Sequence, residues 1–148
     1  MMKTRIEASI VTLLVGVPAF VLGPVIWPPA ADAPVPSSTQ LPFFMAVSAA
    51  EALAFGLGIS FLAFGLPLVR KVANESRLRA WAMYLSISWL LVSWWPHDNL
   101  HQYVGEDTEG LLFLLYGFHK TLMLSGLILA LVFLSVIRQR SVEPAHAG

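Results

Sequence analysis

The sequence predicts an all-α, polytopic membrane protein: a bundle of four transmembrane helices with both termini in the cytoplasm. Three observations carry this prediction. The 148 residues are 57% hydrophobic and only 12% charged, about half the charge of an ordinary soluble domain. Four apolar stretches are each long enough to cross a bilayer. Eight of the nine basic residues fall on one side of the resulting bundle.

Composition also narrows the classes of function. The formal net charge is zero, which argues against a general nucleic-acid binder. There is no cysteine, so disulfide scaffolds, thiolate catalysis and thiolate metal sites are excluded. We expect residues 1–148 to form a single integral membrane domain whose main partner is the lipid bilayer.

The first predicted span covers residues 6–27 and ends at Trp27, an amphipathic ring suited to the headgroup level. The alternative is a secretory signal peptide over residues 1–33, cleaved after the small residues near its end. The apolar stretch exceeds the usual signal-peptide length of about 7–15 residues and contains Pro18 and Pro24. These features favour a retained span.

The second predicted span covers residues 43–69, after a proline-rich loop at 28–42 that we expect to be extended and external. Small residues recur at every fourth position of this span, which lets helix backbones approach closely within lipid. We therefore expect the span to be central in the bundle or to make a dimer contact. The recurring residues are Ser48, Ala52, Gly56 and Ser60.

The third and fourth predicted spans cover residues 78–95 and 111–137, joined by an external loop at 96–110. Neither external loop contains Lys or Arg, whereas basic residues flank the other ends of the spans. The positive-inside rule makes that basic side cytoplasmic, and we expect the location to be a plasma membrane of bacterial type. The eight basic residues are Lys3, Arg5, Arg70, Lys71, Arg77, Arg79, Arg138 and Arg140.

Three ionisable residues lie inside the predicted spans, where such groups are costly: Glu51, His119 and Lys120. Glu51 is nine residues past Pro42 and His119 is nine residues past Gly110, so both lie about 13 Å below the outer boundary. One interpretation is a structural Glu51–Lys120 ion pair that fixes the register of two spans.

The other interpretation of these ionisable residues at equal depth is a site for a proton, an ion or a small ligand. Tyr116 shares a helical stripe with His119. Tyr116 and Lys120 would then help to hold the ligand, with Lys120 balancing the charge.

A second polar group follows the third span. His97 and His101 are four residues apart and would share one face of a helix, a spacing that suits two ligands of one metal ion. Asp98 is placed to be a ligand or to orient one. Because the external loop joins the last two spans, His97, His101 and His119 can converge, with Glu51 and Asp98 as carboxylate ligands. Such a set suits zinc, copper or iron.

These residues predict a small membrane protein with an outward-facing site for a transition metal or small cation. No nucleotide-binding, metalloprotease or Ser-His-Asp motif is present, and no general base stands out, so we do not expect an enzyme. One alternative is a non-catalytic accessory or assembly subunit that packs against itself or a partner. A further alternative is a bundle that binds b-type haem through histidines.

Overall fold

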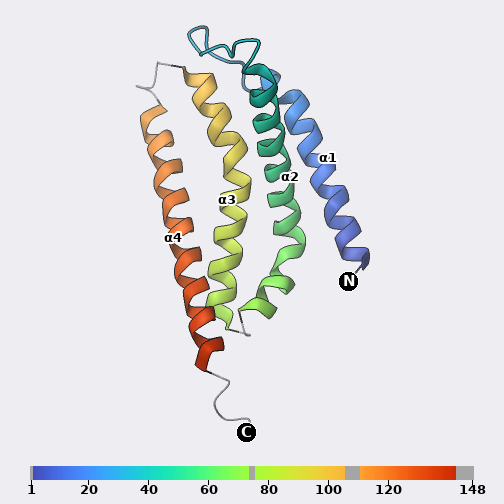
Figure 1. The fold of residues 1–148 in the computed structure, drawn as a ribbon, viewed down its shortest axis with the longest axis vertical. Coiled ribbons are helices and arrows are strands. Elements are labelled where there is room, and N and C mark those ends of the chain that lie inside the picture. The colour runs from blue at the N-terminus through green and yellow to red at the C-terminus, as the bar shows by residue number, and fades with distance from the viewer. Residues whose placement is uncertain (1, 74–75, 106–110, 143–148) are drawn as a thin grey trace.

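The computed structural model describes residues 2–73, 76–105 and 111–142. It contains four long helices: α1 (Met2–Ile26), α2 (Leu41–Val72), α3 (Arg77–Val104) and α4 (Leu112–Val142). They lie side by side in chain order, and the start of α1 lies at the same end of the bundle as the end of α4 (Figure 1). The predicted all-helical class is confirmed.

Three of the four helices are long and apolar enough to cross a membrane: Thr4–Ile26, Leu41–Val72 and Leu112–Gln139, with mean hydropathies of 2.1 to 2.2. α3 is equally long but less apolar, because serines, aromatic residues and a polar end dilute its aliphatic residues. It lies between α2 and α4 (Figure 1). Three of its serines, at positions 86, 88 and 93, are buried there.

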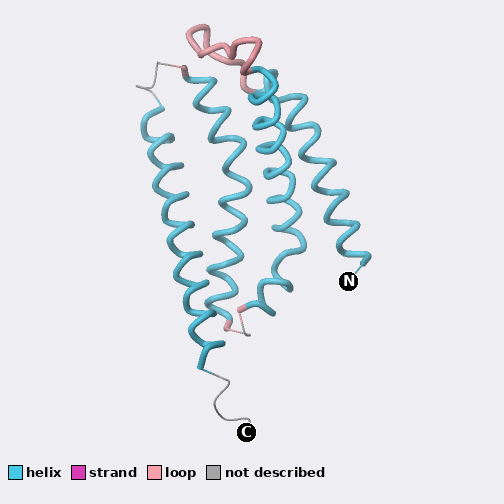
Figure 2. Tube along the Cα trace, in the orientation of Figure 1, coloured by secondary structure: helices cyan, strands magenta, loops and turns pink. Residues whose placement is uncertain are grey.

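Each helix packs mainly against its neighbours in sequence: α1 on α2, α2 on α3, and α3 on α4. Residues 27–40 cross over the upper ends of the first helices as a loop (Figure 2). The amide of Ala30 donates a hydrogen bond of 3.0 Å to the carbonyl of Gln102, which ties this loop to the end of α3.

The small residues of α2 let two neighbours approach it closely. A β-carbon added at Gly56 would lie 2.2 Å from the Thr12 carbonyl oxygen of α1, and one added at Gly58 would lie 2.8 Å from the Val92 amide of α3. Ser60 donates a hydrogen bond of 2.9 Å to the carbonyl of Ala8. The expectation that this helix occupies a central, tightly packed place is confirmed.

α3 continues through Pro96 as one helix to Val104. A proline after an apolar span can break the helix or begin a new short one, and the structure shows neither at Pro96. Gly105 follows with a φ of 60°, a left-handed conformation that glycine adopts at little cost. The segment expected to begin an external loop at residue 96 is therefore helical as far as residue 104.

Candidate metal centre

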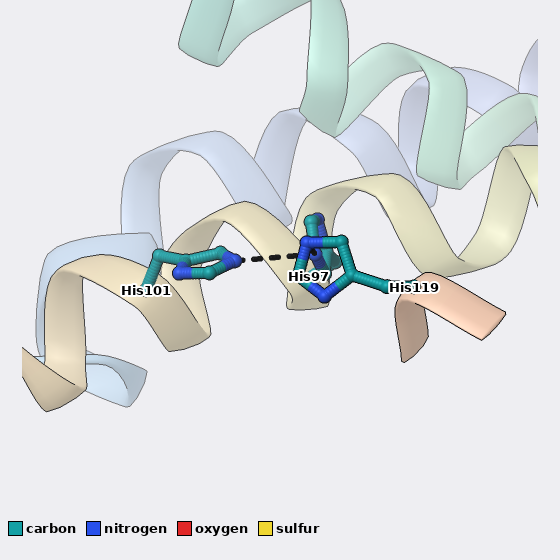
Figure 3. A group of neighbouring side chains, drawn as sticks. All are labelled: His97, His101 and His119. Atoms are coloured by element: carbon teal, nitrogen blue, oxygen red, sulfur yellow. Dashed lines mark hydrogen bonds between the residues drawn. The ribbon is translucent and has the colours of Figure 1, made fainter. Parts of the chain in front are cut away.

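Three histidines meet at the upper end of the bundle, two from α3 and one from α4 (Figure 3). Because α3 does not break at Pro96, His97 and His101 lie one turn apart on the same face. That face is turned toward α4, which supplies His119. The continuous helix is therefore what holds two of the three imidazoles in a fixed relation.

The ring nitrogens converge on one point. The Nε2 atom of His97 lies 3.3 Å from the Nε2 of His119 and 3.2 Å from the Nε2 of His101. One nitrogen from each ring lies within 4.8 Å of those of both other rings. The rings pack edge to face, with centroids 4.7 to 5.5 Å apart.

Hydrogen bonding between the rings does not account for this arrangement well. A neutral imidazole Nε2 offers either one N–H or one lone pair, so the Nε2 of His97 cannot serve both neighbours with well-directed bonds. A metal ion would use all three lone pairs together. Two ligands at a Zn–N distance of about 2.0–2.1 Å and a tetrahedral angle are about 3.3 Å apart, which matches the two short separations.

The tautomer of His119 is fixed by its own helix. Its Nδ1 lies 2.8 Å from the carbonyl oxygen of Leu115, which can only accept, so Nδ1 donates. In the neutral ring the lone pair is then on Nε2, the atom that faces His97. A backbone carbonyl in this position is the usual way in which proteins orient a metal-binding histidine.

The three rings differ in exposure. His97 is partly buried, whereas His101 and His119 are exposed, and the ring of Phe118 lies 5.7 Å from that of His97. Burial lowers the pKa of His97, and the neighbouring rings of His101 and His119 lower it further. A lowered pKa favours the neutral imidazole, which is the form that binds metals.

Glu51 and Asp98 occupy a different place from the three histidines. Neither belongs to the group of converging ligand atoms. Glu51 is 3% exposed, and its carboxyl group lies within hydrogen-bonding reach of that of Asp98. Asp98 also accepts a hydrogen bond of 3.2 Å from Gln102, and all three line a cavity of about 470 Å³. The five expected metal ligands are thus divided between two neighbouring groups.

Lys120 does not lie where the predicted ion pair with Glu51 required it to be. It lies on α4, exposed, with its Nζ 5.9 Å from the centre of the Tyr116 ring. In the described part of the chain no ion pair joins it to Glu51, because α3 lies between α2 and α4. Depth along a span fixes the height of a residue but not its side of the helix, so equal depth did not bring these two residues together.

Sequence reasoning missed the residues that support the histidines. The Leu115 carbonyl and the Phe118 ring were not expected, and neither was Gln102 as the partner of Asp98. Only Gln102 carried a usable signal, since it is four residues from Asp98 and therefore one turn away. Comparisons with models of known protein families, with curated proteins and with solved structures find no match for this chain.

Proposed function

We propose that this protein binds a transition metal ion, zinc in the first place, through His97, His101 and His119 on the outer side of a membrane. The observation that carries the proposal is the convergence of three imidazole nitrogens within 4.8 Å of one another, with two of the three separations at tetrahedral-ligand spacing. Two helices supply them, so the site would also join α3 to α4.

The proposed topology places this centre outside the cell. α3 would cross between about residues 78 and 95, with the other three helices as the remaining spans. The basic residues at the opposite end put both termini in the cytoplasm of a bacterial-type cell. The close packing of α1 on α2 at Gly56 favours retention of α1 as a span over its removal as a signal peptide.

The geometry supports binding and exchange of the ion better than catalysis. Three neutral imidazoles leave the fourth tetrahedral position open, and the exposure of His101 and His119 gives a partner or water access to it. The carboxyl groups of Glu51 and Asp98 lie within hydrogen-bonding reach of each other, and Asp98 accepts a hydrogen bond from Gln102. Neither carboxyl group belongs to the described cluster of converging ligand atoms, where a general base would be needed. A role in holding, sensing or passing on a cation follows.

The metal content of purified protein tests this proposal. Protein stripped with a chelator and titrated with zinc, copper(II) or iron(II) should bind one equivalent, measured by mass spectrometry and calorimetry. His97→Ala and His119→Ala should each weaken binding by about tenfold or more. His146→Ala is the matched control, since it removes the one histidine outside the group, and it should bind as wild type does. Failure of the stripped wild-type protein to take up any of the three ions would refute the proposal.

A second candidate function is a non-catalytic accessory or assembly subunit. The observation that favours it is α4, which packs mainly on α3 and leaves most of its apolar surface uncovered. In this case the protein would form an oligomer or bind another membrane subunit through α4, and the metal titration would be negative. An optical spectrum of the same sample tests the haem alternative, because a Soret band would identify it.

A further inference from the structure

A cleft opens between α1 and α2 at the lower end of the bundle, opposite the histidines. Its volume is about 430 Å³, and residues from the first turns of α1 and the last turns of α2 line it. The cleft shares no residue with the proposed metal centre. What it binds is therefore a separate question from whether the histidines bind a metal.

The cleft exists because the two helices separate below a tight crossing. Gly16 and Gly56 bring the backbones together, and one turn further down Ser60 donates a hydrogen bond to the carbonyl of Ala8. Below this point α2 turns toward α3 and away from α1 (Figure 1). Pro67 lies in this part of α2, where its missing N–H and bulky ring bend a helix.

The cleft has a charged and polar edge and an apolar wall. Arg5 of α1 and Lys71 of α2 lie at its lower edge, both exposed, and Thr4 adds a hydroxyl group. The rest is almost wholly apolar, and no acidic side chain lines it among the residues that the structure describes. The apolar wall includes Leu57, Phe61, Phe64 and Leu68.

The apolar wall is open to the outside of the bundle, since Leu57 is 47% and Leu68 is 61% exposed. In a membrane this side faces the acyl chains, while the two cations lie where the headgroups begin. A water-soluble anion would use only the charged edge, and a neutral lipid only the wall. A ligand with one anionic end and one apolar chain would use both.

We propose that this cleft binds an anionic phospholipid, with its phosphate between Arg5 and Lys71 and one acyl chain along the apolar wall. Basic pockets between transmembrane helices bind acidic headgroups in this way. The lipid would fill the space that the bend in α2 opens, and would hold the lower halves of α1 and α2 in place.

Native mass spectrometry of the whole, delipidated protein tests the proposal. The protein is incubated in detergent with an equal mixture of phosphatidylglycerol and phosphatidylcholine. We expect one phosphatidylglycerol per chain in preference to phosphatidylcholine. Arg5→Gln/Lys71→Gln should lower phosphatidylglycerol retention by roughly 25-fold, since each of the two basic residues near an anionic headgroup contributes about fivefold.

Two further variants separate a cleft from general charge attraction. Arg77→Gln/Arg138→Gln removes two exposed cations from the same end outside the cleft and should leave retention within about twofold of wild type. Ala8→Phe keeps both cations but fills the cleft and should also lose the lipid. Helix content by circular dichroism confirms that each variant is folded. Equal losses in the two double variants, or full retention by Ala8→Phe, would overturn the proposal.

Discussion

His97 is central to the proposed metal centre, since its Nε2 is the atom that lies close to both other imidazoles. Its ring is held between α3 and α4 by Phe118, while the Leu115 carbonyl holds the ring of His119. These contacts restrain the rings of His97 and His119. Restraint of this kind lowers the entropic cost of bringing three ligands together.

The lowered pKa of His97 predicts an acid-sensitive metal-free protein. In the unfolded chain His97 has its ordinary pKa of 6.5, whereas in the folded protein it is lowered by burial and by His101 and His119. The unfolded state thus binds more protons below about pH 6.5, so the free energy of unfolding falls as the pH drops through that value. Thermal melts of chelator-treated protein should show a lower Tm at about pH 5.5 than at about pH 7.5.

His97→Gln should reduce this pH dependence, because it removes the group whose protonation folding opposes. His146→Gln is the control and should keep the dependence of the wild type. A Tm that does not change over this range in the wild-type protein would show that His97 protonates as easily in the folded state as in the unfolded one.

The candidate site could be predicted from the sequence in part. The spacing of His97 and His101 identified one helical face correctly, and chain connectivity indicated that His119 could reach it. Glu51 was assigned to the same site from its depth alone, because a sequence gives the height of a residue within a span but not the helix it faces. The Leu115 carbonyl was invisible for a simpler reason, since every residue has a carbonyl group.

At the level of helices, the contact of α1 with α2 depends on glycine where a side chain cannot fit. Gly56→Ala would place a β-carbon 2.2 Å from the Thr12 carbonyl, a backbone atom that cannot turn aside. We expect a loss of about 1–3 kcal/mol in the free energy of unfolding, as for other overpacked positions. Unfolding in increasing fractions of denaturing detergent measures it.

Gly126→Ala is the matched control for this prediction. It makes the same change on α4, where an added β-carbon meets nothing within 4 Å. Alanine is favoured over glycine in a helix by about 0.5–1 kcal/mol, so this variant should be as stable as wild type or slightly more so. If both variants lose the same stability, the cost comes from the helix itself and not from the contact.

The helices themselves were largely predictable, since apolar length sets three of them directly. The end of the third helix was not predictable, because a proline after an apolar stretch is compatible with a stop, a kink or a continuous helix. Buried packing on both sides stabilises α3 through Pro96, with Trp95 at 8% and Leu100 at 3% exposed. Contacts between helices decide whether a helix continues through a proline. The local sequence does not show those contacts.

For the whole molecule, the proposed topology can be mapped with single cysteines, because the chain has none of its own. Ser38→Cys lies in the exposed loop between α1 and α2. Ser76→Cys lies before α3, where the native side chain makes no capping hydrogen bond. A membrane-impermeant maleimide should label Ser38→Cys in intact cells, and Ser76→Cys only after the membrane is opened. The opposite pattern would invert the proposed orientation and place the candidate metal centre inside the cell.

The order of the helices in space follows their order in the chain, so each helix finds its principal partner in the one made immediately before it. A nascent chain leaving the ribosome could therefore acquire its contacts one hairpin at a time, without waiting for a distant segment. α4 would arrive last onto a surface already complete. The short-range character of its contacts suits the protein to rapid insertion, and His119 would be the final ligand delivered to the centre.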